Sequence, residues 1–280
     1  MQTSVDLDLK HPDSERAVPV RLWLPEGTIR AWILFSVGFG GERSGYAYLG
    51  RAWAERGLAT AVIEHVGSNL DVLKSLPGQH REERNRQVAL RVGDKDELAA
   101  RPRDVLLVYS HLQERIGTLP LGLAGHSFGT YTVMAAQGLA TVPVLPSLEQ
   151  AVSEARSCMI ISPQPPGVLF SPRVLGSVGM PTLVVTGTKD GPLHGEGDYH
   201  ARAAVYDHLP PSDRNLVVLD GVEHMAFANI GLGLAPTLRA VEGLSTAWWE
   251  STLFGSDATA EQRALLLKSA GGEQIKGVYR

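Results

Sequence analysis

A serine, an aspartate and a histidine in the second half of this 280-residue chain have the types and order that nucleophilic catalysis requires. Ser127 lies in Gly125-His-Ser-Phe-Gly129, directly after an apolar run and directly before a helical pattern. This setting predicts a sharp strand-to-helix turn that presents the serine hydroxyl to a substrate. The two glycines are small enough to let strand and helix approach each other. An ordinary turn is the alternative, and the flanking patterns favour the nucleophile.

The serine needs a neighbouring base, because a hydroxyl group is a weak nucleophile until its proton is taken. His224 follows the apolar run Asn215–Leu219 and the turn formers Asp220-Gly221, so we expect it on a loop just past a strand. An isolated histidine on a loop is often only a surface residue, but this position favours a catalytic base. The other histidines after Ser127 are expected to be solvated in a helix-and-loop segment: His194, His200 and His208.

The acid that orients the base should also follow a strand. Asp190 lies four residues after the apolar run 181–186 and is followed by a glycine. We predict that its carboxylate accepts a hydrogen bond from the Nδ1–H of His224, which fixes the tautomer and stabilises the imidazolium. Asp198 and Asp220 are the alternative acids, although Asp220 is close enough to His224 to belong to the turn.

Two backbone N–H groups are predicted to form an oxyanion hole, the pair of donors that stabilises negative charge during acyl transfer. One belongs to Phe128, the residue after the nucleophile. The other belongs to Phe39 in the glycine-rich segment 35–41, where the backbone can approach a ligand closely. The same segment could be a plain turn or a phosphate loop. It lacks G-x-G-x-x-G spacing and a following lysine, which makes nucleotide binding an unfavourable interpretation.

Short apolar runs alternate with helical patterns along the chain, as expected for a mostly parallel sheet with helices on both faces. The run 18–24 alternates apolar and polar residues and predicts an early, half-exposed antiparallel strand. The remaining strands are predicted at 31–37, 59–63, 120–125, 158–162, 181–186 and 215–219. Helices are predicted at 43–56, 104–112, 128–139, 199–208, 238–253 and 260–267.

Residues 66–100 differ from this pattern because they are polar and highly charged. A solvated helix and loop is the simpler interpretation. A lid or pocket wall is the functional one, since long insertions in such sheets lie at the carboxyl ends of the strands, where ligands bind. We find no repeat or linker, so the expected organisation is one domain over residues 1–280.

Composition narrows the classes of function. The chain is 44% hydrophobic and 20% charged, which is typical of a globular protein and excludes general disorder. The net charge of −4 without basic clusters gives no reason to expect a nucleic-acid partner. The single cysteine, Cys158, lies in an apolar run and is expected to be a buried thiol. Neither a signal peptide nor a membrane span is visible, so the expected location is the cytoplasm. No feature of the sequence indicates an oligomeric state.

Motifs over most of the chain are similar to the α/β-hydrolase superfamily, and within it to bacterial dienelactone-hydrolase-like and platelet-activating-factor-acetylhydrolase-like esterases. The resemblance rests on these segments: Val18-Pro-Val-Arg-Leu-Trp-Leu-Pro25, Leu34-Phe-Ser-Val-Gly-Phe-Gly-Gly41, His65-Val-Gly-Ser68, Arg101-Pro-Arg-Asp-Val105, Gly125-His-Ser-Phe-Gly129, Thr186-Gly-Thr-Lys-Asp190 and Asp220-Gly-Val-Glu-His224. It implies hydrolysis of carboxylic esters without a metal or an organic cofactor.

The chain departs from this family pattern at two points. Ser36-Val37-Gly38 stands where members usually have Ser-His-Gly, which puts the rigidity of the oxyanion loop in question. The acetylhydrolase branch places its acid after an earlier strand, where this chain has Ile161-Ser-Pro-Gln-Pro165 and no carboxylate. The second departure favours Asp190 as the acid and weakens any expectation of phospholipid specificity.

The sequence therefore favours a serine esterase with a small-molecule ester substrate. Its pocket is expected to be apolar, with modest acyl groups as the preferred substrates, and to be formed by these residues: Val37, His65, Ser68, His126, Met225 and Phe227. Two alternatives remain open. The same three residues could cleave amide, thioester or lactone bonds, or the chain could be a binding protein that keeps a hydrolase fold without catalysis.

Overall fold

A single mixed sheet runs through the computed structural model, which describes residues 3–78, 80–117, 119–143, 145, 148, 151–191, 198–254 and 258–280. Within these residues the strand order is β1-β2-β4-β3-β5-β6-β7-β8-β9. The strands are β1 (Thr3–Lys10), β2 (Ala17–Leu24), β3 (Ala31–Ser36), β4 (Leu58–Ile63), β5 (Leu121–His126), β6 (Ala155–Ile161), β7 (Thr182–Lys189), β8 (Arg214–Glu223) and β9 (Ile275–Tyr279).

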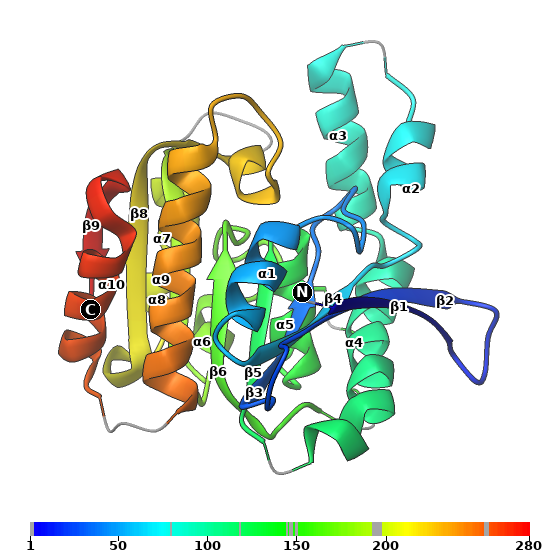
Figure 1. Cartoon of the computed structure of the whole chain (residues 1–280). Coiled ribbons are helices and arrows are strands. Elements are labelled where there is room, and N and C mark those ends of the chain that lie inside the picture. Colours follow the sequence, from blue (N-terminus) through cyan, green and yellow to red (C-terminus); the bar gives the residue numbers. More distant parts are fainter. Residues whose placement is uncertain are drawn as a thin grey trace.

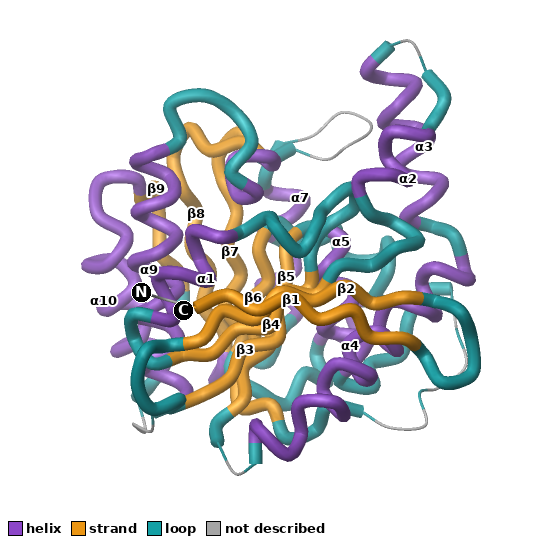
Figure 2. Tube along the Cα trace, turned by 45° about the vertical axis from the view of Figure 1, so that its right-hand side comes forward, coloured by secondary structure: helices purple, strands orange, loops and turns teal. Residues whose placement is uncertain are grey.

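The six strands from β4 to β8 in this order are parallel, whereas β1, β2 and β9 are antiparallel to their neighbours. The central strands β3, β4 and β5 are buried along their whole length, because helices cover both of their faces. At one side, β1 and β2 extend away from the body of the sheet as a two-stranded ribbon (Figure 2). Parallel pairing brings the carboxyl ends of β5, β6, β7 and β8 to the same edge.

Helices lie on both faces of the sheet (Figure 1). Their bounds are α1 (Ala47–Ala54), α2 (Leu70–Ser75), α3 (Arg81–Val92), α4 (Lys95–Ile116), α5 (Phe128–Ala136), α6 (Pro172–Leu175), α7 (His200–Ala203), α8 (Val205–His208), α9 (Ala235–Leu253) and α10 (Ala260–Gly271). The core accordingly has two parts: α4, α5 and α8 pack on one face of the sheet, and α1, α9 and α10 pack on the other. Among the described residues, none of the helices combines the length and the apolarity that a bilayer crossing needs.

The polar segment 66–100 forms α2, α3 and the first turns of α4. In Figure 1, α2 and α3 project beyond the carboxyl edge of the sheet rather than packing on it. Asn69 begins α2 by accepting a hydrogen bond from the Val72 N–H, and Asp94 begins α4 by accepting from the N–H groups of Asp96 and Glu97. The charged composition of α3 therefore reflects its exposure to solvent.

The strands and helices predicted from apolar patterns are present, and most of their end points lie within a few residues of the prediction. The helix predicted at 104–112 is longer, because α4 begins at Lys95, and the helix predicted at 199–208 is divided into α7 and α8. The antiparallel direction predicted for 18–24 is confirmed in β2. The edge strands β1 and β9 and the short helix α6 were not predicted, and the segment 66–100, expected to be a helix and a loop, contains the two separate helices α2 and α3. Their residues are largely exposed or half-buried, so they lack the apolar periodicity from which strands and helices are recognised.

Candidate active site

The nucleophile candidate lies in a strained turn. Ser127 connects β5 to α5 with backbone angles of φ 53° and ψ −123°, a conformation that non-glycine residues rarely adopt. A Cβ atom on Gly125 would collide with the backbone of Gly129, and one on Gly129 would collide with the carbonyl of Ser36. Both neighbours of the turn must therefore be glycine, because β5, α5 and the end of β3 meet here at backbone contact distance.

Three side chains that are distant in sequence meet at this turn. His224 begins the 3₁₀ segment after β8, and its Nε2 lies 2.9 Å from the Ser127 Oγ. The Nδ1 of His224 lies 2.9 Å from the Asp190 Oδ1. Ser127 is 8% exposed and the His224 side chain is 16% exposed, whereas Asp190 is fully buried. The serine and the imidazole thus keep a small exposed surface, whereas the carboxylate is shielded from water.

The buried carboxylate of Asp190 is held by three further groups. Ser162 Oγ donates to Oδ1 at 2.9 Å, and Thr186 Oγ1 donates to Oδ2 at 2.9 Å. The guanidinium of Arg202 forms an ion pair with Oδ1 at 3.0 Å. Burial by itself would raise the pKa of Asp190, but the hydrogen bond from His224 and the positive charge of Arg202 outweigh it and lower the pKa. The carboxylate is therefore ionised and fixed in orientation.

A second imidazole lies beside the first. The rings of His126 and His224 are 4.9 Å apart between centroids, and the Tyr46 hydroxyl is 2.7 Å from the His126 Nδ1. Burial, together with the neighbouring charge of His224, lowers the pKa of His126 well below its usual value. His126 is neutral at physiological pH and adds no positive charge next to an imidazolium at His224.

The glycine-rich segment after β3 packs against the Ser127 turn. A Cβ atom on Gly38 would lie 3.2 Å from both the Ser127 Cβ and the His126 carbonyl oxygen. On either side of Phe39 the backbone is anchored: the Val37 carbonyl accepts from Arg101, and the Gly40 N–H donates to the Ser68 carbonyl at 2.7 Å. The Phe128 N–H has no acceptor within its own helix, because Phe128 is the first residue of α5.

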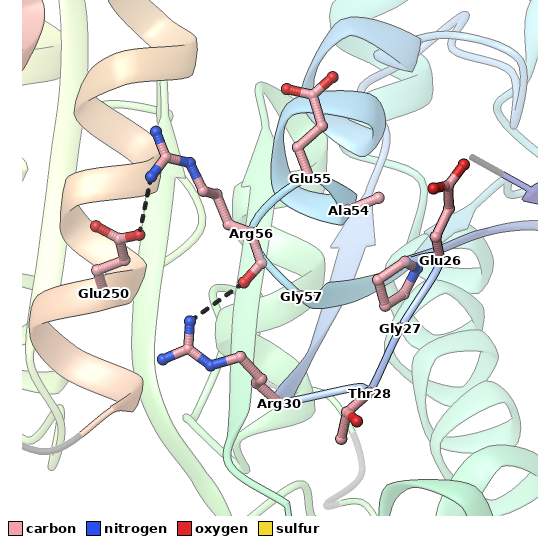
Figure 3. Close-up of a pocket in the computed structure, with 10 residues that line it drawn as sticks. Glu26, Gly27, Thr28, Arg30, Ala54, Glu55, Arg56, Gly57 and Glu250 are labelled. Atoms are coloured by element: carbon pink, nitrogen blue, oxygen red, sulfur yellow. Dashed lines mark hydrogen bonds and ion pairs between the residues drawn. The ribbon is translucent and has the colours of Figure 1, made fainter. Parts of the chain in front are cut away.

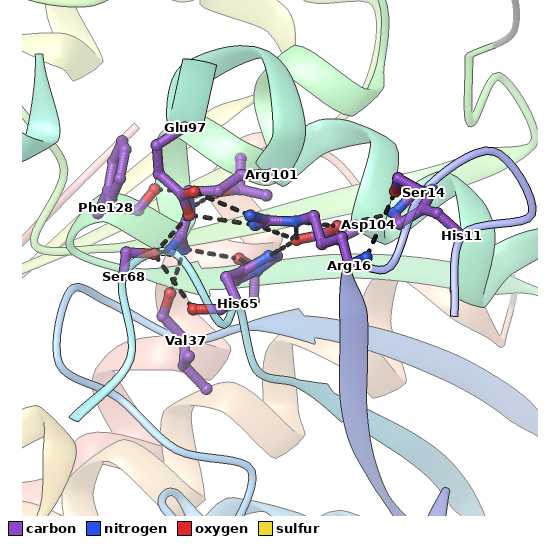
Figure 4. A network of polar contacts seen from close by, with 12 residues as sticks. His11, Ser14, Arg16, Val37, His65, Ser68, Glu97, Arg101, Asp104 and Phe128 are labelled. Carbon is purple, nitrogen blue, oxygen red and sulfur yellow. Dashed lines mark hydrogen bonds and ion pairs between the residues drawn. The ribbon is translucent and has the colours of Figure 1, made fainter. Parts of the chain in front are cut away.

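A buried polar network supports this segment from below (Figure 4). Arg101, fully buried on α4, donates to Ser68 Oγ at 2.6 Å and to Thr132 Oγ1 at 2.7 Å, and lies 4.2 Å from the Phe128 ring centroid. His65 bonds both Ser36 and Asp104, and Asp104 is also paired with Arg16. This network links the segments that carry both predicted oxyanion donors to α4, because Arg101 contacts the Val37 carbonyl and the Phe128 ring.

The residues predicted for the substrate pocket differ in their exposure to solvent. Val37 within the glycine-rich segment 35–41 and His65 and Ser68 next to it have at most 1% exposure. His126 and Phe227 are also buried, with ring centroids 5.9 Å apart. Met225 is 42% exposed beside the base. Of the six, only Met225 is exposed.

The alternative acids form hydrogen bonds with residues other than Ser127 and His224. Asp220 accepts from the Thr188 hydroxyl, and Asp198 contacts His200 on an exposed surface. His208 is exposed at the end of α8. His194 lies outside the described residues. Among the described residues, no group of histidine, cysteine and acidic side chains has the arrangement of a metal site.

An open groove lies at the opposite end of the sheet, near the starts of β3 and β4 (Figure 3). It is lined by Pro25, Glu26, Gly27, Thr28, Arg30, Ala54, Glu55, Arg56, Gly57 and Glu250 and has a volume of about 760 Å³. Arg56 pairs with Glu250 at 3.6 Å and Arg30 stacks on Phe254. In an open parallel sheet, ligands bind at the carboxyl ends of the strands. The groove is at the other end, and it has mixed charge.

Comparison with known proteins identifies the fold. No protein-family model matches the chain, and a search of curated proteins finds no significant match. Among solved structures, the chain is similar to a dienelactone hydrolase from Anabaena variabilis, with a TM-score of 0.58, 19% identity, and coverage of 90% of this chain and 99% of that chain. This chain has a dienelactone-hydrolase-like α/β-hydrolase fold.

An α/β-hydrolase sheet explains why the sequence predictions for Ser127, Asp190 and His224 pointed to one place, because all three follow parallel strands that end at one edge. Three side chains around Asp190 were not singled out from the sequence: Ser162, Thr186 and Arg202. Ser162 directly follows β6 and Thr186 lies within β7, so the position of each residue relative to a strand was an available signal. Arg202 lies on the short helix α7 and gave no signal, since its burial depends on the packing of that helix.

Proposed function

We propose that this protein is a serine hydrolase that cleaves carboxylic esters, with Ser127 as nucleophile, His224 as base and Asp190 as orienting acid. The proposal is carried by one observation: a serine in a strained, partly accessible turn lies 2.9 Å from an imidazole whose other nitrogen contacts a buried carboxylate. A neutral imidazole in this position can accept the serine proton.

The reaction proceeds in two acyl-transfer steps. Ser127 Oγ attacks the ester carbonyl carbon while its proton moves to His224 Nε2, which gives a tetrahedral oxyanion. The N–H groups of Phe39 and Phe128 stabilise that oxyanion. His224 then returns the proton to the departing alcohol. A water molecule, deprotonated by His224, attacks the acyl-enzyme, and collapse of the second oxyanion releases the acid and restores Ser127.

The substrate class follows from the side chains near the nucleophile. Phe39 is half-buried and Met225 is exposed, and both are apolar, which suits an uncharged small-molecule ester with a modest acyl group. The mechanism requires no metal or organic cofactor. A lactone is a cyclic ester, and the structural similarity to a protein named dienelactone hydrolase supports including lactones among the substrates tested. Amides and thioesters remain further alternatives for the same residues.

Hydrolysis of p-nitrophenyl acetate and butyrate tests the proposal. We expect Ser127→Ala to lower kcat by at least about 10⁴-fold. Ser177→Ala is a matched control, since the hydroxyl of this exposed serine donates to the Val174 carbonyl on the short helix α6. Equal rates in Ser127→Ala and wild type would refute the proposal.

A fluorophosphonate probe separates an enzyme from a binding protein with the same fold. We expect covalent labelling at Ser127 in the wild type and none in Ser127→Ala. Absence of labelling, combined with absence of ester hydrolysis, would favour the binding protein.

A further inference from the structure

The hydroxyl of Ser162 contacts two of the three side chains assigned above. Ser162 directly follows β6, one strand away from the strand that leads to Asp190. Its Oγ lies 2.9 Å from Asp190 Oδ1 and 2.6 Å from His224 Nδ1, while those two atoms are 2.9 Å from each other. Three polar atoms thus form a closed triangle at the buried side of the imidazole.

The proton positions in this triangle follow from the chemistry of the groups. An ionised Asp190 can only accept, so the Ser162 O–H donates to Oδ1. The Ser162 oxygen keeps lone pairs that can accept from the His224 Nδ1–H, which is then shared between a hydroxyl and a carboxylate oxygen. Both contacts require the proton on Nδ1 and leave Nε2 free to face Ser127. The triangle therefore selects the tautomer that a base needs.

The backbone holds Ser162 in this place against its own conformational preference. Its φ is 54°, which is strained for a residue other than glycine, and the residue is fully buried. The Ser162 N–H donates to the Val185 carbonyl at 2.7 Å, and its carbonyl accepts from Arg202 Nη1 at 3.2 Å. Arg202 also pairs with Asp190, so one guanidinium fixes both residues relative to each other.

We propose that Ser162 is a positioning residue of the active site, whose hydroxyl locks the Asp190 carboxylate and the His224 imidazole in the orientation and tautomer that the reaction uses. This inference rests on the proposed function of Ser127 and His224. Glycine would adopt the positive φ at position 162 with less strain. The serine therefore supplies something that glycine lacks, and this is the hydroxyl group.

Ser162→Gly tests the proposal, because it removes the hydroxyl while relieving the backbone strain. We expect kcat to fall roughly 10- to 100-fold, the range for loss of a hydrogen bond to a charged group, with KM within about twofold of wild type. The midpoint of thermal unfolding should stay the same or rise. In proton NMR, the low-field signal of the His224 Nδ1–H should shift in Ser162→Gly. A kcat within twofold of wild type would overturn the proposal.

Ser157→Ala is the matched control. Ser157 is also fully buried in β6, and its hydroxyl bonds to Thr252 on the far side of the sheet from α5. We expect kcat, KM and the His224 Nδ1–H signal to match the wild type. If the control lost activity to the same extent as Ser162→Gly, loss of packing in β6 would explain both, and the positioning role would be refuted.

A relocated acid tests the same geometry by rescue. Asp190→Ala should be nearly inactive and leaves space beside the His224 Nδ1. Adding Ser162→Asp places a carboxylate next to that nitrogen and next to Arg202, and we expect the double variant to exceed Asp190→Ala in kcat by at least about tenfold. A folded double variant that is no more active than Asp190→Ala would count against the proposal.

Failure of this inference can be distinguished from failure of the proposed function. Full activity in Ser127→Ala would remove the function itself, whatever Ser162 does. Loss of activity and labelling in Ser127→Ala, together with wild-type kcat in Ser162→Gly, would remove only the role of Ser162.

Discussion

Two Ser–His–Asp arrangements with nearly the same hydrogen-bond geometry occur in this molecule. In the first, His224 lies 2.9 Å from Ser127 Oγ and 2.9 Å from Asp190. In the second, His65 Nε2 lies 2.9 Å from Ser36 Oγ, and His65 Nδ1 lies 2.8 Å from Asp104. Distances between serine, histidine and aspartate therefore do not distinguish a candidate active site from a structural network.

Accessibility and charge distinguish the two. Ser36, His65 and Asp104 are all fully buried, so no substrate reaches that serine. Burial and the nearby guanidinium of Arg101 lower the pKa of His65 to about 3. An imidazole in this environment cannot take a proton at neutral pH. The His224 side chain is instead 16% exposed, and Ser127 beside it keeps 8% exposure. A catalytic base must be accessible to the substrate, and its surroundings must stabilise the positive charge that it gains with the proton.

The largest contrast is expected between the two aspartates. Asp190→Asn should lower kcat by about 10⁴-fold, because the amide no longer stabilises the Nδ1–H tautomer and the imidazolium of His224. Asp104→Asn should leave kcat of the folded protein within a few-fold of wild type. It should instead reduce the free energy of unfolding by about 3 kcal/mol, since Arg16 loses the more deeply buried of its two carboxylate partners. Kinetics and urea unfolding measure the two effects.

If Asp104→Asn abolished activity in a protein that is still folded and as stable as wild type, the distinction between the two arrangements would be wrong. Asp6→Asn is a control for loss of an exposed ion pair, because Asp6 pairs with Arg21 on the edge ribbon. We expect almost no change in stability there.

The pH dependence of stability should reveal the buried histidine. His65 has a pKa of about 3 when folded and an ordinary value of 6.5 when unfolded, so between these values the unfolded chain binds one more proton. The free energy of unfolding therefore falls as the pH falls through this window, by about 1.4 kcal/mol per pH unit from this residue.

Urea unfolding of wild type and His65→Gln at several pH values from about 6.5 to 4.5 measures this slope. His126 also has a lowered pKa, but it is present in both proteins and cancels from the difference. Asp104 and Asp190 have lowered pKa values and titrate below the window. We expect a shallower slope in His65→Gln. The same slope in both proteins would show that His65 is protonated in the fold.

A smaller effect on kcat is expected from Arg101, through which the buried network contacts the candidate active site. Arg101→Lys keeps a positive charge but loses the planar group that holds the Val37 carbonyl and several hydroxyls at once. The Phe39 N–H should be less well placed, and we expect kcat to fall about tenfold with KM nearly unchanged, less than for complete loss of an oxyanion donor. Arg16→Lys is the control, because Arg16 contacts Glu97 and Asp104 but not the oxyanion segment. An unchanged kcat in Arg101→Lys would separate the network from catalysis.

Much of the fold could be predicted from the sequence because buried strands have continuous apolar runs and amphipathic helices repeat their apolar positions. The three residues assigned to catalysis could be found for a related reason: each follows a recognisable strand, and parallel strands end at one edge. The edge strands β1 and β9 could not be found in this way, because exposed strands need no apolar periodicity.

The pocket was harder to predict than the catalytic residues. Val37, His65 and Ser68 follow central strands, and strand position suggested that they face a substrate. The structure buries them instead, because α4 brings Arg101 and Asp104 against the glycine-rich segment 35–41 and the end of β4. The motif containing Arg101 and Asp104 was visible in the sequence, but the direction in which its side chains point depends on how α4 packs against β3 and β4.

By itself, the sequence determined the succession of the buried strands and the amphipathic helices along the chain, the tight turn between Gly125 and Gly129, and the candidates Ser127, Asp190 and His224. These follow from local rules of backbone sterics and apolar periodicity. Only the tertiary structure decided which histidine borders solvent and which is enclosed with a guanidinium. It also brought Ser162 and Arg202 to Asp190. Burial and electrostatic environment are properties of groups that are far apart in the chain, and they exist only after the sheet and its helices have packed.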